Sequence, residues 1–233
     1  MIEIVHQDAH LLVVNKPAGW LVHRTALDRH ESRIILPALR IQTGRTLWPL
    51  HRLDKGTSGT LAFALDAETA FRMAESFESG EGLQKCYRAI VRGWPPERLL
   101  IDHPLRRLDD DKRPGRLVRQ EAITRLRTLQ RGNLPIPQGG FPTLRWAEVE
   151  LVPHTGRRHQ LRRHMKHIAH PIIGDATHGK GPINRSVGEH LGAGRLWLHA
   201  ASLEVNHPWS GERLRFEARA DASWELWREG RTA

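Results

Sequence analysis

The nine residues from His51 to Gly59 place a carboxylate where it could take part in a reaction. Asp54 lies between Arg52 and Lys55, in a turn rich in Gly, Ser and Thr that precedes the apolar run 60–65. A turn in front of a strand exposes side chains on a rigid support. Cations within about 4–6 Å would keep this carboxylate ionised, which suits a nucleophile. The alternative is an ordinary turn Asp that bonds its own backbone.

The only tyrosine of the chain, Tyr87, lies in a second segment that could do chemistry. Residues 85–93 alternate as a strand, with Lys85, Tyr87, Ala89 and Val91 on one face. From the residues alone, Tyr87 is equally well explained as a half-buried strand aromatic.

A basic segment follows the predicted strand 144–152. Residues 157–170 contain five Lys or Arg and four His, and no acidic residue. We expect a helix capped by Thr155 and ended before Pro171, with Leu161 buried. Its N-terminus would offer unpaired N–H groups to phosphate. Three polar residues at that end become candidate RNA contacts: Arg157, Arg158 and His159.

The histidines of this helix also raise the alternative of a metal site. His164 and His167 are spaced i, i+3, which can place two rings on one helix face. A metal would need a third ligand and an orienting partner, and the neighbouring cations would repel a divalent ion. We therefore expect no metal here, and a merely basic surface helix remains an open interpretation.

Composition points to a polyanionic partner. Lys and Arg outnumber Asp and Glu by 36 to 26, which gives a net charge of +10. Such an excess favours nucleic acid, although an anionic membrane surface or a plain solubility charge would also explain it. The single cysteine, Cys86, excludes an intramolecular disulfide and indicates a reducing compartment, the cytoplasm. The N-terminus carries no signal-peptide pattern, and no apolar run approaches the roughly 20 residues of a membrane span.

Three motifs together resemble the RluA-type pseudouridine synthases, in that family's order. They are His51-Arg52-Leu53-Asp54-x-x-Thr57-Ser58-Gly59, Lys85-x-Tyr87-x-Ala89-x-Val91-x-Gly93 and Thr155-Gly156-Arg157-x-His159-Gln160-Leu161-Arg162. The resemblance implies that Asp54 is the catalytic carboxylate. It implies further that Tyr87 sits against a flipped base, where it has been proposed to move a proton. Arg162 would pair with Asp54, and Leu161 would pack near the target base. The turn 170–179 also matches the family, and for Asp175 we favour a structural role.

The implied reaction is the isomerisation of uridine to pseudouridine, which requires no redox change, metal or cofactor. A uridine in a stem must first be flipped out, and Arg52 is the candidate to fill the gap. The other residues that we expect to contact RNA are His51, Lys16, Arg157, Arg158 and His159. Whether Asp54 attacks C1′ or C6 is left open.

The segments 15–24 and 179–190 most resemble the branch that modifies uridine 65 in the T stem of tRNA. Alternatives are a ribosomal RNA pseudouridine synthase, a non-catalytic basic RNA-binding protein and a metal-dependent phosphohydrolase. We expect tRNA as the partner, no membrane, no protein partner and a monomer.

The expected fold is α+β, with a mixed, largely antiparallel sheet, flanking helices and a central RNA-binding cleft. We expect one catalytic domain over 1–233, an irregular insertion at about 94–143, and no separate N-terminal RNA-binding module. The pattern predicts a helix over 28–42 with Ile34, Ile35, Leu39 and Ile41 inward. It predicts another after Asp66, with Phe71 and Phe77 in the core.

Overall fold

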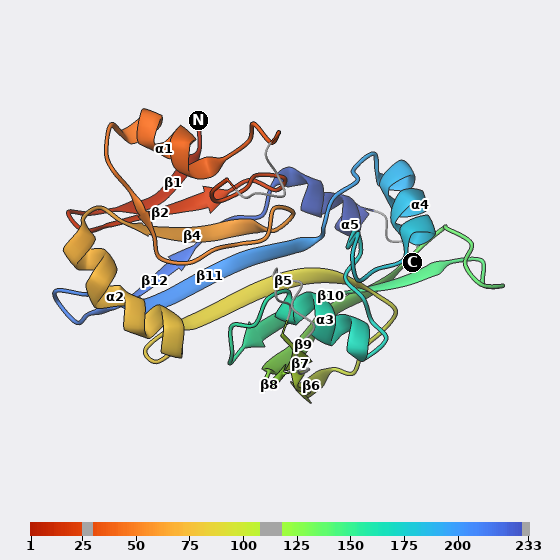
Figure 1. Cartoon of the computed structure of the whole chain (residues 1–233). Coiled ribbons are helices and arrows are strands. Elements are labelled where there is room, and N and C mark those ends of the chain that lie inside the picture. The colour runs from red at the N-terminus through yellow and green to blue at the C-terminus, as the bar shows by residue number, and fades with distance from the viewer. Residues whose placement is uncertain (25–29, 108–117, 230–233) are drawn as a thin grey trace. The chain divides into compact units, whose positions relative to one another are not determined.

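The computed structural model describes residues 1–24, 30–107 and 118–229. Its strands pair mostly antiparallel and its helices flank them, which confirms the predicted mixed α+β fold class (Figure 1). No helix in these ranges is long and apolar enough to cross a membrane. The elements are β1 (Glu3–Gln7), β2 (Leu11–Lys16), α1 (Ile35–Thr43), β3 (Trp48–Pro49), β4 (Ser58–Ala64), α2 (Ala67–Ser79), β5 (Gln84–Arg92), β6 (Arg98–Asp102), β7 (Leu105–Arg106), β8 (Arg119–Gln120), β9 (Ile123–Leu134), β10 (Leu144–Pro153), α3 (Gln160–His167), α4 (Gly181–Leu191), β11 (Leu198–Asn206), β12 (Arg213–Glu217), the 3-10 turn η2 (Ala222–Glu225) and α5 (Leu226–Glu229).

The chain divides into two compact units. The first unit contains Met1–Tyr87 and Leu198–Trp224, and the second contains Arg88–Trp197 and Glu225–Ala233. In the first unit the strand order is β1-β2-β4-β11, with β3 on β4 and β12 on β11. The strands β1 and β2 form an N-terminal hairpin, pairing antiparallel from Glu3↔Asn15 onward.

Alternation along β2 builds a core on each face of the first unit's strands. Leu12 and Val14 pack in one cluster with α1 residues such as Leu39, whereas Leu11 and Val13 pack in another with Met73 of α2 and with β11 and β12. Successive side chains of a strand point to opposite faces, so β2 serves both cores.

Helix α1 is shorter than the sequence pattern predicted. Residues 30–34 are not helical, and 28–29 lie outside the described residues. Pro37 is tolerated because it falls in the first turn, where backbone N–H groups have no intrahelical partner. Ile35 and Leu39 are buried as predicted, but Ile41 is 87 % exposed, so its inward placement was wrong.

Helix α2 begins after Asp66, as the sequence indicated, and Phe77 packs against the core as predicted, whereas Phe71 does not. Asp66 caps it by accepting the Thr69 N–H at 2.7 Å, and Gly80 ends it in the left-handed conformation. The buried stripe consists of Thr69 and Met73. Phe71 is 82 % exposed, so the prediction that it belongs to the core was wrong.

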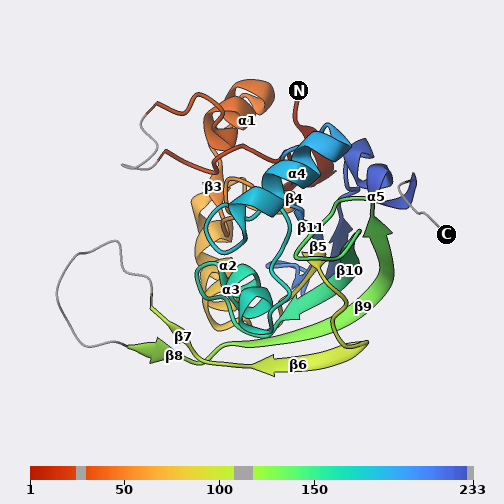
Figure 2. The ribbon, with the colours of Figure 1, turned by 90° about the vertical axis from the view of Figure 1, so that its right-hand side faces the viewer.

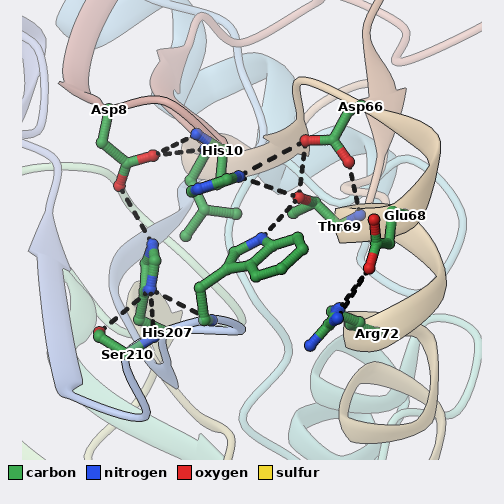
Figure 3. A network of polar contacts seen from close by, with 10 residues as sticks. Asp8, His10, Asp66, Glu68, Thr69, Arg72, His207 and Ser210 are labelled. Carbon is green, nitrogen blue, oxygen red and sulfur yellow. Dashed lines mark hydrogen bonds and ion pairs between the residues drawn. The ribbon is translucent and has the colours of Figure 1, made fainter.

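A polar network ties the β1–β2 turn of the first unit to the start of α2 and to the β11–β12 turn (Figure 3). Asp8 Oδ1 accepts the backbone N–H groups of His10 and Leu11, each at 2.7 Å. Asp8 Oδ2 lies 3.6 Å from Nε2 of His207. His10 Nδ1 lies 3.6 Å from Asp66 Oδ2 at the α2 cap. These contacts hold the β1–β2 turn, the start of α2 and the β11–β12 turn together within the first unit.

The second unit is organised by the long hairpin of β9 and β10. The two strands pair from Leu144↔Leu134 to Pro153↔Thr124, and the strand order is β5-β10-β9-β6. Figure 2 shows β9 curving along β10, with β6 on its other edge. The region 94–143, expected to be irregular, is therefore largely strand where it is described: it contains β6, β7, β8 and β9.

The first motif ends in a glycine, Gly59, because the backbone of a neighbouring strand leaves no room for a side chain there. It stands in β4 opposite Ala200 of β11, in the parallel pair His199↔Ser58 and Ala200↔Gly59. Its φ is +112°, and a Cβ built there would overlap the backbone carbonyl of Ala200. A side chain at this position would force the two strands apart.

We therefore predict that Gly59→Ala costs more than about 3 kcal/mol of unfolding free energy, because left-handed strain of about 1–2 kcal/mol adds to a backbone clash. Gly44→Ala is the matched control: its φ is +67° and a Cβ there meets nothing within 4 Å. That control should lose only the strain. Urea unfolding of both variants measures the difference, and equal losses would contradict the close approach of β4 and β11.

Candidate active site

The turn that carries Asp54 is closed by its own backbone and by the start of β4. The Thr57 N–H donates to the Asp54 carbonyl at 3.0 Å, and β4 begins at Ser58. Ser58 Oγ contacts His199 Nδ1 at 2.9 Å, while His199 Nε2 lies 2.9 Å from the Ala218 carbonyl. A carbonyl only accepts, so Nε2 of His199 carries the proton and the Ser58 hydroxyl donates to Nδ1.

Lys16, expected to contact RNA, is instead buried inside the first unit. It is 0 % exposed, and its Nζ donates to the carbonyls of Pro17 at 3.0 Å, Trp20 at 2.8 Å and Lys55 at 3.4 Å. The Gly19 N–H also donates to the Lys55 carbonyl, at 2.8 Å. The structure thus corrects the expectation of a surface phosphate contact: Lys16 holds residues 16–20 against the turn of Asp54.

The cations that flank Asp54 in sequence have different surroundings. Lys55 Nζ lies 2.6 Å from Glu31 Oε2. The hydrogen bond from Lys55, followed by that from the Arg33 backbone, lowers the pKa of Glu31 to about 2. Arg52 is exposed, as expected of a side chain that meets RNA. Lys55 therefore fastens residues near Glu31 to the Asp54 turn.

His51, also expected to contact RNA, makes contacts within its own unit. Its Nε2 accepts the Ala62 N–H at 3.1 Å, and its ring stacks on Phe77 with centroids 5.2 Å apart. Burial lowers its pKa well below the ordinary value, and the charge of Lys85 adds to the effect. A neutral, half-buried imidazole thus supports β4 and α2, and its contact with RNA stays a prediction.

Tyr87 comes within electrostatic range of Asp54 in the first unit. Burial raises the pKa of the phenol, and the charge of Asp54 raises it further, with a smaller contribution from Cys86. Tyr87 packs beside the core cluster that contains Leu53. Two of the three motifs thus place a carboxylate and a protonated phenol in one neighbourhood.

The third motif enters α3 of the second unit through a left-handed residue. The helix begins at Gln160, later than the predicted cap at Thr155, because His159 has φ 54° and interrupts the helical path. The Thr155 hydroxyl donates to Gln160 Oε1 at 2.7 Å. Gln160 Nε2 donates to the Ile123 carbonyl and to Thr124 Oγ1, each at 3.0 Å. Gln160 thereby fixes the start of α3 against β9.

Arg162 forms a buried bidentate ion pair with Asp175. Its Nε and Nη2 each lie 2.8 Å from one carboxylate oxygen of Asp175, whose side chain is 1 % exposed. Asp175 Oδ1 also accepts the N–H groups of Thr177 and His178. Burial alone would raise the pKa of Asp175, but the hydrogen bond from Arg162 and these backbone donors lower it. Asp175 thus combines the expected structural role in its turn with a charge partner for Arg162.

The turn that bears Asp175 is held by α4. Asn184 Oδ1 accepts the Gly174 N–H at 2.9 Å, and Asn184 Nδ2 donates to the Asp175 carbonyl at 3.0 Å. Gly174 has φ +80°, and a Cβ there would overlap the Arg195 carbonyl. No local pattern in the sequence indicates this clasp, although Gly174, Asp175 and Asn184 all fall in the family-like segments 170–179 and 179–190.

The remaining α3 candidates fall into a buried and a more accessible group. Leu161 is 7 % exposed. His159 Nδ1 lies 3.2 Å from Nε2 of His178, and burial is the largest cause that lowers the pKa of His178 to about 4. Arg157 donates to the Glu121 carbonyl at 3.0 Å, and Arg158 is exposed. The pairing of Arg162 with Asp54 stays a prediction. Within the described ranges, no group of three or more His, Cys, Asp or Glu could hold a metal ion.

Comparison with known proteins identifies the site's relatives. The family model for RNA pseudouridylate synthase matches residues 10–167. The protein named tRNA pseudouridine synthase C from Vibrio cholerae is 46 % identical, covering 97 % of this chain and 93 % of that protein. The protein of the same name from Haemophilus influenzae is 45 % identical, covering 97 % and 95 %. That from Pectobacterium carotovorum is 46 % identical over 97 % of this chain, which spans 61 % of its length.

Solved structures agree on the fold. Human RNA Pseudouridylate Synthase Domain Containing 4 superimposes with a TM-score of 0.71 at 28 % identity, covering 97 % of this chain and 93 % of that chain. Human RNA Pseudouridylate Synthase Domain Containing 1 gives a TM-score of 0.74 at 24 % identity, covering 100 % and 96 %.

The single tyrosine allows a direct test of its contact with Asp54. We predict that phenolate absorbance of the folded protein appears at a higher pH than that of a free tyrosine, because burial and the charge of Asp54 raise the pKa of Tyr87. Asp54→Asn removes one of these causes, so its titration should move to lower pH. Glu75→Gln, on the exposed face of α2, is the control and should titrate as wild type. An unchanged titration midpoint in Asp54→Asn would show that the charge of Asp54 does not act on the phenol of Tyr87.

We predict that Asp175→Asn lowers the free energy of unfolding by about 3–5 kcal/mol at neutral pH, because it removes the charge of one side of a buried bidentate ion pair. The folded pKa of Asp175 lies below its unfolded value. The stabilisation is therefore full above that unfolded value and is lost as the pH falls through the folded one. Unfolding measured from pH 7 to pH 3 should show the gap to wild type narrowing below about pH 4. A gap that is absent at pH 7 would refute the importance of the pair.

Proposed function

Because the chain belongs to the RNA pseudouridylate synthase family, we propose that it isomerises uridine 65 in the T stem of tRNA to pseudouridine. The relatives that match nearly the whole chain carry the name tRNA pseudouridine synthase C. The segments 15–24 and 179–190 resemble the branch that acts on uridine 65. The observation that carries the proposal is the neighbourhood of Asp54 and Tyr87, which come from two family motifs far apart in the chain.

The reaction breaks the N-glycosidic bond between N1 and C1′, turns the base, and joins C5 to C1′. The proton of C5 is lost and N1 gains one, so uridine and pseudouridine have the same atoms. Asp54 acts as the nucleophile, at C1′ or C6, or as the charge that stabilises the transition state. No electron acceptor enters this balance.

Arg162 supplies the cation that keeps Asp54 ionised and aimed. A guanidinium carries five N–H donors in a planar fork, and Asp175 engages two of its nitrogens. The fork is therefore held rigidly before substrate arrives, and rigid placement is what an electrostatic partner needs. Leu161, next to it on α3, packs against the target base.

Tyr87 receives the flipped base and starts the reaction as a protonated phenol. The charge of Asp54 is one cause of its raised pKa. When Asp54 forms a covalent bond to the substrate, that charge disappears and the pKa of Tyr87 falls. The phenol can then give its proton to N1 of the released base, and the resulting phenolate accepts the proton that C5 loses. The covalent state of Asp54 thus times the proton transfer.

RNA contacts follow from exposure. Arg52 is exposed beside the Asp54 turn and fills the space that the flipped uridine leaves. Arg158 is exposed near the start of α3 and contacts phosphate, while the half-buried Arg157 and His159 orient that surface. We propose that the protein works as a monomer in the cytoplasm, in keeping with its single cysteine.

The test is pseudouridine mapping in cells that lack the protein, complemented with wild type, Asp54→Asn or Glu75→Gln. We expect wild type and Glu75→Gln to restore pseudouridine at position 65 of tRNA, and Asp54→Asn to restore none while still binding tRNA. Conversion in ribosomal RNA alone would replace the tRNA assignment. No conversion in either RNA, with binding retained, would favour a non-catalytic RNA-binding protein.

A further inference from the structure

A second basic cluster lies in the second unit, outside the residues assigned to catalysis. His103 precedes β7, Arg119 begins β8, and Arg163 and His167 are one turn apart on α3. The rings of His103 and His167 stack in parallel, with centroids 3.6 Å apart and planes inclined by 13°. His167 and Arg119 are exposed, whereas His103 and Arg163 are half-buried.

His164 anchors this cluster from below. It is 0 % exposed, its Nε2 lies 3.0 Å from the His103 carbonyl, and its Nδ1 lies 2.9 Å from Thr124 Oγ1. Because a carbonyl only accepts, Nε2 carries the proton, and Nδ1 accepts from the Thr124 hydroxyl. Both ring nitrogens are thereby used, so His164 is no metal ligand. It fixes the backbone of His103 beside α3 and so holds the two stacked rings in register.

The cluster concentrates positive charge. Burial lowers the pKa of His103, and the charges of His167, Arg119 and Arg163 lower it further, so the charged neighbours that shift it are all basic. Burial also lowers the pKa of His164, and the charges of His103, His167 and Arg163 lower it further. In addition, Arg106 stands directly opposite Arg119 in the antiparallel pair β7–β8. Like charges at directly opposed positions destabilise a strand pair.

A surface with such repulsion becomes more stable when an anion binds to it. Imidazolium and guanidinium groups form short, charge-assisted hydrogen bonds with phosphate oxygens. An anion near His103 reverses the effect of the surrounding cations, since an opposite charge favours the protonated imidazole. Two stacked neutral rings would then become a stack with one proton, taken from solvent.

We propose that His103, His167, Arg119 and Arg163 form a subsite for a backbone phosphate of the RNA substrate, and that phosphate binding is coupled to uptake of one proton by the histidine pair. This inference rests on the proposed function, because it takes RNA as the source of the phosphate. The contact carries no base identity and fixes the register of the RNA on the second unit.

The main test measures tRNA binding by wild type and by the double variant His103→Gln/His167→Gln. Glutamine keeps a polar side chain without a titrating charge. We expect wild-type affinity to rise several-fold between pH 7.5 and pH 6, and the double variant to lose most of this rise. His190→Gln, exposed on α4, is the matched control and should behave as wild type. Equal thermal unfolding of the variants confirms that all are folded.

Turnover and salt dependence provide the second readout. Arg119→Ala and the histidine variant should raise KM several-fold and leave kcat unchanged, because a phosphate contact that takes no part in the chemistry stabilises substrate and transition state equally. Arg119→Ala should also reduce the slope of log K against log salt by roughly one. Variants with wild-type KM, salt slope and pH dependence would overturn the proposal.

Inorganic phosphate separates the site from the substrate. In the NMR titration of the free protein, the imidazole pKa of His103 should be higher in phosphate than in chloride of equal ionic strength. Phosphate could raise this pKa while the double variant His103→Gln/His167→Gln binds tRNA as wild type does. The cluster would then be an anion site without a role in RNA binding, and the inference would fail. If wild type neither binds nor converts any RNA, the proposed function itself fails.

Discussion

The carbonyl oxygen of Lys55 accepts hydrogen bonds from the Gly19 N–H and from the buried ammonium of Lys16, and the placement of Asp54 depends on this junction. An ammonium without water is costly unless its three donors are satisfied. Here three backbone carbonyls from two loops satisfy them. The requirement works in both directions: the charge orders the loops, and the loops exclude water from the charge. The backbone at Asp54, which directly precedes Lys55, is therefore held in a fixed position.

In the second unit, the buried charge of Arg162 must likewise be compensated and held in place. A buried guanidinium needs a partner of opposite charge, and a single ion pair is a weak device when either side chain can rotate. Asp175 cannot rotate, because two backbone N–H groups hold one of its oxygens and Asn184 holds its carbonyl. The catalytic role that we propose for Arg162 thus depends on residues of α4, which touch no substrate in the proposed reaction.

How much of this could be read from the sequence varies with the range of the interaction. The cap of α2 at Asp66 and the strand after the Asp54 turn follow from local spacing, and both were predicted. The exposure of Phe71 was not, because periodicity identifies a helix but not which of two apolar stripes meets the strands. The late start of α3 depends on the left-handed conformation of His159, for which a non-glycine residue gives no signal. Lys16 and His51 were assigned to RNA because basic residues in a motif favour it. Lys16 is buried because the carbonyls of Pro17, Trp20 and Lys55 gather around one ammonium, an arrangement that no local pattern reveals.

Histidines of α3 have two different roles: His164 is structural, and His167 pairs with His103 at the surface. His164 is neutral, buried and fully hydrogen-bonded, so it contributes fixed geometry at every pH near neutrality. His103 and His167 stack at the surface among arginines, where protonation is opposed by the neighbours and would be favoured by an anion. Sequence spacing alone suggested a metal for the i, i+3 pair. The structure shows instead that His164 holds the backbone of His103, and that the ring of His103 stacks on His167. A helix with many histidines therefore need not be a metal site. The buried His164 has a structural role, whereas the stacked pair of His103 and His167 lies where an anion could reach it.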